Sequence, residues 1–147
     1  MAAWTEILTI GIGSGFLSLK LLASWSQLRC AARGLEKGIL SPHISNSNMA
    51  CSEGEFSNIL PLPATSHEPW DDLQDVVESL SGRLVRLEDT YLHAVFKTPI
   101  FGFAQDFEAR WDKEAKCIHV RAASRVGISD LGSNGQRIEK MRYFLES

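Results

Sequence analysis

DFEARWDKEAKCIHVRAAS, residues 106–124, is the stretch of sequence that decides the expected fold. Apolar and polar residues alternate along 106–111 and again along 117–124. The apolar members are Phe107, Ala109, Trp111, Ile118, Val120 and Ala122. A period of two residues is typical of strands whose sheet has one covered face and one polar face. With residues 112–115 as the connecting turn, the pattern predicts an antiparallel hairpin.

Two more strands and two helices are expected around this hairpin. Residues 84–87 and 91–98 have the composition of strands. A helix is expected from Pro69, which suits a first helical turn, to Gly82, which ends it. Residues 134–145 predict a final helix. The expected fold class is α+β, a four-stranded antiparallel sheet with helices packed on one face, preceded by a single N-terminal transmembrane helix.

Composition limits the classes of protein to which the chain can belong. Its 147 residues, 44% hydrophobic and 22% charged, suit one ordinary domain with a tail. The net charge of -3 is unlike the basic surface that binds a nucleic-acid backbone, so nucleic acid is not an expected partner. Three widely spaced cysteines encode neither a disulfide framework nor a zinc knuckle, which indicates a reducing compartment.

The N-terminal run ILTIGIGSGFLSLKLLASW, residues 7–25, predicts the membrane helix. At about 1.5 Å per residue it covers about 28 Å, close to the thickness of a hydrocarbon core. Lys20 opposes insertion, but it lies off-centre, and a lysine can extend toward the polar side. A buried or interfacial helix is the alternative interpretation. The expected division is therefore a membrane helix at 1–30, an extended linker at 31–66 and an α+β domain at 67–147.

Basic residues after this run predict its orientation. Arg29, Arg33 and Lys37 follow the run, whereas Glu6 is the only charged residue before it. Because basic residues stay on the cytoplasmic side, we expect a single-pass membrane protein with its domain on the cytoplasm-like side: cytosol, stroma or matrix. The lack of a basic residue before the run also disfavours a cleaved secretory signal.

Small residues share one side of the predicted membrane helix. They are Gly11, Ser14, Gly15 and Ser18. Small side chains let a second helix approach closely, and Gly11 and Gly15 form a G-x-x-x-G pair. We therefore expect this side to contact a helix of a partner protein. A phosphate-binding loop is the weaker interpretation, because the Lys-Ser/Thr ending and the preceding strand are missing.

Residues 38–66 are rich in Gly, Pro, Asn and Ser and have no apolar period, which is typical of a connector. Its short apolar stretch, residues 59–62, is expected to dock on the domain. Pro61 and Pro63 are incompatible with a central strand but suit the edge of a sheet.

The run IHVRAASRVGISDLGSNGQRIEKMR, residues 118–142, resembles the C-terminal signature of the family called domain of unknown function 1499. The similarity extends back through 100–103 and 89–94 to Cys51-Ser52, so it covers about residues 51–145. The sequence departs from the family pattern at Gln105-Asp106, where Asp-Asp is usual, and after Ser52. The resemblance implies one α+β fold unit, commonly beside a membrane segment, and implies no established activity.

Polar residues concentrate between the last predicted strand and the last helix. They are Arg121, Ser124, Arg125, Ser129, Asp130, Asn134 and Arg137. Asp130 or Asn134 can cap the helix, and the loop amides with arginine side chains can hold an anion at its positive end. The favoured interpretation is structural, with an Arg125–Asp130 ion pair that fixes a glycine-dependent turn.

Metal binding and nucleophilic catalysis fit the sequence less well. Cys117 and His119 share a strand face near His93, but no fourth ligand is placed. A Cys51–His67 pair lacks an oriented base and an oxyanion site. We therefore expect no catalytic residue, no metal and no cofactor.

Two aromatic residues, Phe101 and Phe103, flank Gly102 in an expected loop after Pro99. Exposed rings at a loop tip can anchor a protein interface or touch a membrane. Both residues are therefore candidate interface anchors.

These features predict a non-catalytic, membrane-anchored accessory or assembly subunit of a larger complex. The membrane and the complex are its expected partners, reached through the N-terminal helix and the linker, in a bioenergetic membrane of an organelle or a bacterial inner membrane. The alternative is a small-molecule or lipid-binding domain that holds an anionic ligand at Arg121, Arg125 and Arg137. A hydrolase using Cys51 or Ser124 is a more distant third.

Overall fold

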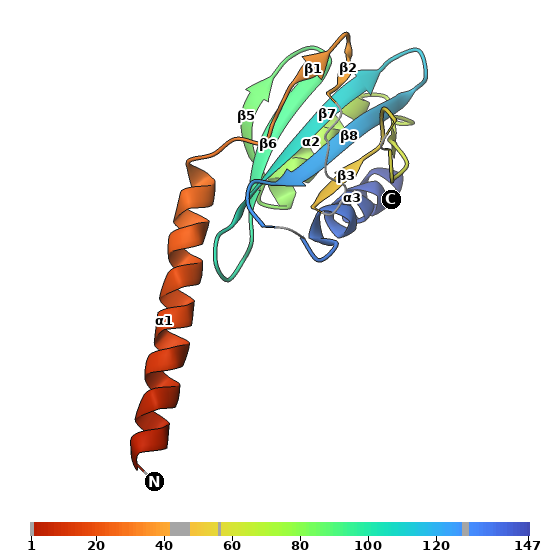
Figure 1. The fold of residues 1–147 in the computed structure, drawn as a ribbon. Helices are drawn as coiled ribbons and strands as arrows, with labels where there is room; N and C mark the ends of the chain where they lie inside the picture. Colours follow the sequence, from red (N-terminus) through yellow and green to blue (C-terminus); the bar gives the residue numbers. More distant parts are fainter. Residues whose placement is uncertain (1, 42–47, 56, 128–129) are drawn as a thin grey trace.

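The computed structural model describes residues 2–41, 48–55, 57–127 and 130–147, with side chains from residue 15 onward. The helices are α1 (Ala2–Gln27), α2 (Pro69–Ser79) and α3 (Ser133–Glu146). The strands are β1 (Leu35–Glu36), β2 (Ile39–Leu40), β3 (Met49–Cys51), β4 (Leu62–Pro63), β5 (Arg83–Leu87), β6 (Tyr91–Lys97), β7 (Ala104–Asp112) and β8 (Cys117–Ser124). Figure 1 shows a sheet domain from which α1 extends as a separate rod.

The main sheet is antiparallel and, within the described residues, has six strands. Its order is β3-β8-β7-β6-β5, and β4 also pairs with β8. β3 pairs with residues 121–123 of β8, and β4 pairs with residues 117–118, so the two short strands share one edge. The predicted count of four strands is therefore wrong, because the expected linker contributes β3 and β4 to the sheet. Pro63 lies at this edge, as its missing N–H requires.

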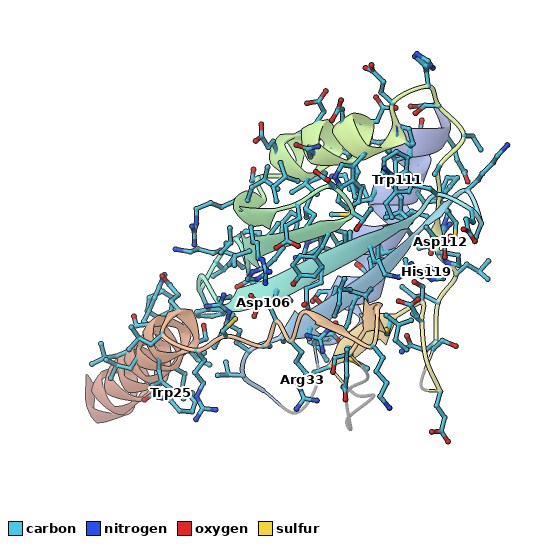
Figure 2. All side chains as sticks on the ribbon, turned by 90° about the horizontal axis from the view of Figure 1, so that it is seen from above. Trp25, Arg33, Asp106, Trp111, Asp112 and His119 are labelled. Carbon is cyan, nitrogen blue, oxygen red and sulfur yellow. The ribbon has the colours of Figure 1, made fainter. Side chains whose placement is uncertain are left out.

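Helices α2 and α3 cover one face of the sheet, which confirms that part of the expected fold (Figure 2). The core between these helices and the sheet contains the apolar residues that alternate along the strands. Its fully buried members include Leu73, Val77, Leu92, Phe107, Ile118, Val120, Ile138 and Met141. The period-two pattern of β7 and β8 therefore predicted the core face correctly.

The end of α2 depends on two neighbouring residues. Ser81, with φ of 65°, takes the left-handed conformation expected of a glycine at a helix end. The amide of Gly82 donates to the carbonyl of Val77 at 2.8 Å. A Cβ on Gly82 would lie 2.6 Å from the Phe96 ring and 2.7 Å from the Val77 side chain. Position 82 requires a glycine because a side chain there would collide with its neighbours. The left-handed conformation that turns the chain is adopted by Ser81.

Gly82→Ala is expected to lower the free energy of unfolding by about 1–3 kcal/mol, because a packed core resists an added methyl group. Gly135→Ala in α3 is the matched control. A Cβ there would meet nothing within 4 Å, and alanine in a helix is favoured over glycine by about 0.5–1 kcal/mol. Thermal unfolding followed by circular dichroism should move in opposite directions for the two variants. Equal shifts would contradict the steric explanation.

Helix α1 contains the whole apolar run 7–25 and ends before Leu28. Within the described part of the chain, no helix is both long enough and apolar enough to cross a membrane, so the transmembrane helix of the expected fold class is not found there. The described side chains of α1 nevertheless include several exposed large apolar residues.

Candidate functional site

The second face of the sheet is covered by residues 28–41, which we call the strap (Figure 2). The amide of Ala31 donates to Asp106 Oδ2 at 2.7 Å, and the amide of Gly34 donates to Glu108 Oε1 at 2.6 Å. Asp106 and Glu108 are each 1% exposed. The polar face of the sheet is therefore covered as well, because the strap uses the carboxylates of β7 as acceptors for its backbone amides.

Asp106 is the centre of the first part of this network. Its carboxylate accepts from His93 Nε2 at 2.7 Å and from Arg125 Nε and Nη2 at 2.8 and 2.7 Å, besides the Ala31 amide. Burial raises the pKa of Asp106, but the hydrogen bonds from His93, Arg125 and Ala31 outweigh it and hold this pKa well below its ordinary value. Asp106 therefore stays ionised and holds the strap and two side chains together.

Glu108 is the centre of the second part. Arg121 Nε donates to Glu108 Oε2 at 2.7 Å, and the Tyr91 hydroxyl donates to Oε1 at 2.7 Å. Arg121 also donates to the backbone carbonyls of Ala31 and Ser41, one near each end of the strap. Burial, followed by the bond to Glu108, raises the pKa of Tyr91. This fully buried ion pair is therefore a clamp that closes the strap against β7 and β8.

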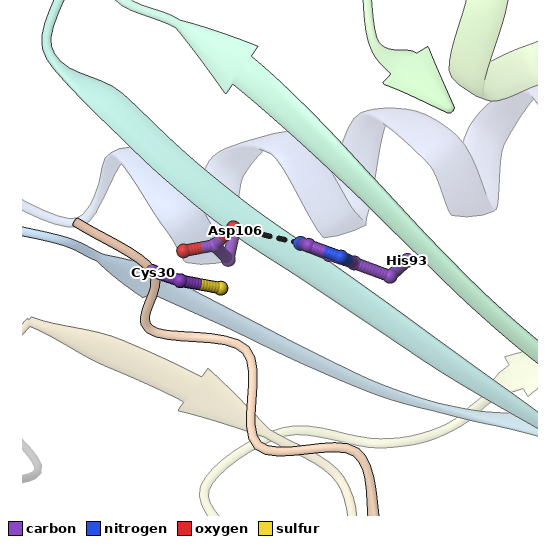
Figure 3. Close-up of side chains that lie close together, drawn as sticks. All are labelled: Cys30, His93 and Asp106. Carbon is purple, nitrogen blue, oxygen red and sulfur yellow. Dashed lines mark hydrogen bonds and ion pairs between the residues drawn. The ribbon is translucent and has the colours of Figure 1, made fainter. Parts of the chain in front are cut away.

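Cys30, His93 and Asp106 form a group of potential metal ligands within the described residues, with donor atoms within 4.8 Å of one another (Figure 3). His93 Nε2 lies 2.7 Å from the carboxylate, which can only accept when ionised, so this nitrogen carries a proton. Both Asp106 oxygens already accept from Arg125. His93 Nε2 and the Asp106 carboxylate are therefore hydrogen-bonded to each other, and the carboxylate also binds the Arg125 guanidinium. These bonds oppose metal binding.

The set that the sequence offered for a metal is not brought together. Cys117 Sγ and His119 Nε2 lie 3.6 Å apart, whereas His93 is held at Asp106. His119 instead faces Glu53, whose carboxylate lies 3.9 Å from its Nε2 and accepts from Arg110 Nη2 at 2.6 Å.

A spatial arrangement that resembles a nucleophile, a base and an acid is formed by Ser52, His119 and Glu53. Ser52 Oγ is 3.4 Å from His119 Nδ1. The same hydroxyl accepts from the Val120 amide at 2.8 Å and lies 3.3 Å from the Val120 carbonyl, and Ser52 is only 9% exposed. The serine is therefore placed to tie the chain after β3 to β8. Sequence reasoning missed this contact.

Cys51 and His67 are not positioned as a catalytic pair. The Cys51 thiol donates to the backbone carbonyl of Glu53 at 3.2 Å. Burial raises the pKa of this thiol, which is the opposite of the activation that a nucleophile needs. His67 instead lines a separate pocket with Trp111 and Lys113.

The predicted arginine cluster is divided between the two faces of the sheet. Arg121 and Arg125 bind Glu108 and Asp106 on the strap side. Arg137 lies on the helix side, where it donates to Gln105 and sits 4.4 Å from the centre of the Phe96 ring. Burial lowers the pKa of Arg137 to about 10. The three guanidinium groups therefore do not converge on one point.

Asp130 and Asn134 organise the start of α3. The N-cap position is Gly132, which is neither of the two predicted residues, but Asp130 Oδ2 accepts from the Asn134 amide at 2.8 Å and so binds the first turn of the helix. Asn134 Nδ2 donates to the Asn48 carbonyl at 2.9 Å and to Ser124 Oγ at 3.3 Å. The predicted Arg125–Asp130 pair is replaced by Arg125–Asp106. Ser129 lies outside the described residues.

A cavity of about 570 Å³ lies between α1, the β6–β7 hairpin and the β8–α3 loop. Its apolar lining includes Leu19, Leu22, Trp25, Phe103, Val126 and Leu131. Ser124 and Asp130 of the predicted polar cluster also line it. The cavity therefore combines an apolar wall with a carboxylate.

The predicted anchors Phe101 and Phe103 lie in the loop between β6 and β7, but they are partly buried. The Phe101 ring centre is 5.6 Å from that of Phe16 and 6.1 Å from that of Phe103. Ile100 is the exposed apolar residue of this loop, at 70%. The loop is therefore apolar as expected, with a different residue at its surface.

The predicted partner-helix side is described only in part. A Cβ on Gly15 would meet nothing within 4 Å, so this position is open to a close neighbour. Ser18 is exposed. The surroundings of Gly11 and of the Ser14 side chain lie outside what the structure describes.

A comparison with protein families finds that the one described as "Protein of unknown function (DUF1499)" matches residues 39–145. The match begins earlier than the motifs indicated and includes β2 to α3, whereas α1 and most of the strap precede it. No curated protein matches the chain.

Proposed function

The chain belongs to the DUF1499 family, and we propose that it is a non-catalytic, membrane-anchored accessory or assembly subunit of a larger membrane complex. In this proposal α1 inserts into the bilayer, and the sheet domain stays on the cytoplasm-like side. A helix of the partner complex packs against the small residues of α1.

The observation that carries the proposal is the set of exposed apolar side chains around α1. Phe16, Leu17, Leu21 and Leu22 are 50%, 61%, 63% and 49% exposed. Several exposed large apolar side chains on one helix are typical of a contact with lipid or protein. The apolar run continues toward the N-terminus through residues 7–13, which extends the surface away from the domain.

The strap supports an assembly role because it joins α1 to the domain through many bonds. Arg125 Nη1 donates to the carbonyl of Gln27, the last residue of α1, at 3.2 Å. The Ala31 amide then binds Asp106, and its carbonyl binds Arg121. A flexible tether would let the domain rotate freely, whereas this connection holds the helix and the domain in one orientation. An accessory subunit that positions partners needs such a connection.

A ligand-binding role is the second candidate, and the cavity of about 570 Å³ favours it, since ligand pockets commonly have this size. The anionic ligand that the sequence predicts fits the cavity poorly. Asp130 lines the cavity, while Arg121 and Arg125 are engaged by carboxylates elsewhere.

The proposed function is tested on native membranes solubilised in a mild detergent. We expect the chain to sediment with membranes and to migrate with a large complex in native electrophoresis, from which mass spectrometry identifies the partners. Gly15→Leu should release the chain from the complex, because bulk at an open small-residue position blocks helix contact. Leu21→Phe, which adds bulk at an exposed position elsewhere on α1, is the control. Migration of the unaltered chain as a free monomer would contradict the proposal.

A further inference from the structure

We propose that the tip of the β6–β7 hairpin, residues 99–103, enters the lipid surface beside α1 and is the point at which the domain itself meets the membrane. This inference rests on the proposed anchoring by α1. It adds a second element that inserts, and the proposed partner of the tip is a phospholipid bilayer.

The base of the hairpin is fastened to the last turn of α1. The amide of Ala104 donates to Ser26 Oγ at 3.0 Å, and this serine is fully buried. Gln27 Nε2 donates to the Gly102 carbonyl at 3.2 Å, and Gln27 Oε1 accepts from Lys97 Nζ at 2.9 Å. The bonds of Ala104 and Lys97 fix the base of the hairpin, and the bond to Gly102 already holds the tip against α1.

The tip of the hairpin then follows α1 toward its N-terminus. Lys20 Nζ donates to the Ile100 carbonyl at 3.0 Å, and the rings of Phe16 and Phe101 are 5.6 Å apart. From Ser26 to Phe16 the helix rises about 15 Å at about 1.5 Å per residue. The tip therefore lies beside the middle of α1, and any bilayer that receives this part of the helix also receives the tip.

The chemistry of the tip suits lipid. Residues 98–103 read TPIFGF and carry no charge. Ile100 is 70% exposed beside α1, on which Leu17 is 61% exposed. Isolated apolar residues on a surface are ordinary, but here the tip packs through Phe101 on Phe16 of a helix whose other apolar side chains are exposed as well.

Two lysines flank the apolar tip. Lys20 Nζ lies at the tip, 5.7 Å from the centre of the Phe16 ring, and Lys97 lies at the base of the hairpin. Cations beside an apolar element are typical of interfacial anchors that face anionic lipid. The hydrogen bond to Ile100 also gives the Lys20 ammonium a partner at that depth, which lessens the cost of its place in an apolar run.

The test measures how deeply single labels lie in a membrane. Ile100→Cys, Leu17→Cys and Leu60→Cys are prepared in a Cys30→Ser background, because Cys30 is exposed while burial raises the pKa of the thiols of Cys51 and Cys117. Each protein is labelled with the fluorophore NBD and placed in phosphatidylcholine vesicles with a minority of phosphatidylglycerol. Quenching by brominated phosphatidylcholine reports contact with the acyl region. Leu60 is the matched control, because it is 74% exposed but lies beside α3.

We expect the labels at 17 and 100 to lose comparable shares of their fluorescence and the label at 60 to lose none. Quenching at 17 without quenching at 100 overturns the inference and leaves anchoring by α1 intact. Absence of quenching at both positions overturns the anchoring proposal as well. A label at 100 that is unquenched in vesicles but shielded from aqueous iodide in native membranes assigns the tip to a protein partner and also overturns the inference. Circular dichroism of each labelled protein verifies the fold.

Discussion

Arg121→Met is expected to lower the free energy of unfolding by about 3–5 kcal/mol, because it leaves a buried carboxylate without its cation. Arg121 and Glu108 are each 1% exposed and are joined through Nε and Oε2 at 2.7 Å. The same substitution removes the bonds to the Ala31 and Ser41 carbonyls. Thermal unfolding of the full chain in mild detergent should show a Tm lower by roughly 6–20 °C.

Two controls separate this effect from the loss of any surface charge. Arg86→Met removes an arginine that pairs with Glu88 at the surface, where its side chain is 61% exposed, and a change of only about 0–1 kcal/mol is expected. Adding Glu108→Gln to Arg121→Met should restore part of the lost stability, since the uncompensated charge is then gone. Similar losses in the Arg121 and Arg86 variants would show that the buried pair is not a clamp.

Asp106→Asn is expected to release the N-terminal end of the strap and to cost about 3 kcal/mol, since Arg125 loses its buried partner. The two oxygens of the aspartate accept all of its hydrogen bonds, whereas an asparagine has only one acceptor oxygen. Hydrogen exchange of the Ala31 amide, which Asp106 accepts at 2.7 Å, should become faster. Protease cleavage within residues 28–34 should increase in parallel.

The same variant should lose part of the acid sensitivity of the domain. Because the pKa of Asp106 is lower in the folded state than in the unfolded chain, its contribution to stability is fully present above the unfolded pKa of about 3.9 and is lost as the pH falls below it. The unfolding free energy of the natural chain should therefore fall from about pH 5 toward pH 2 more steeply than that of Asp106→Asn. Asp75→Asn, at an exposed position on α2, should keep the natural slope. Parallel curves for the natural chain and the Asp106 variant would contradict the assigned role.

Local patterns predicted the elements that are long enough to show a period. β8 was expected at 117–124 and is found there, and α3, expected at 134–145, runs from Ser133 to Glu146. β3 and β4 were not predicted because strands of two or three residues have no period to detect. Their place is set by pairing with β8, a contact made across a long stretch of sequence.

Only part of the buried network could be predicted from the sequence. A turn at 112–115 places Asp112 opposite Cys117, and the same register places Glu108 opposite Arg121. This pairing of opposite charges was an available signal for the clamp. The partner of Arg125 was assigned to nearby Asp130, whereas it is Asp106, 19 positions away. The strap could not be foreseen, because its bonds are formed by backbone amides, which carry no residue-specific signal.

The strap also determines the order in which the protein can mature. The amides of the strap donate to carboxylates that lie 74 and 75 residues later in the chain. The Ala31 carbonyl accepts from Arg121, which lies 90 residues later. A ribosome therefore releases α1 long before β7 and β8 exist to receive the strap. The helix is therefore complete first, and the strap is secured only when β7 and β8 have been made. Closing these long loops last makes the completed clamp a late event in folding, so a nascent chain stalled before β8 would carry α1 and an unsecured strap.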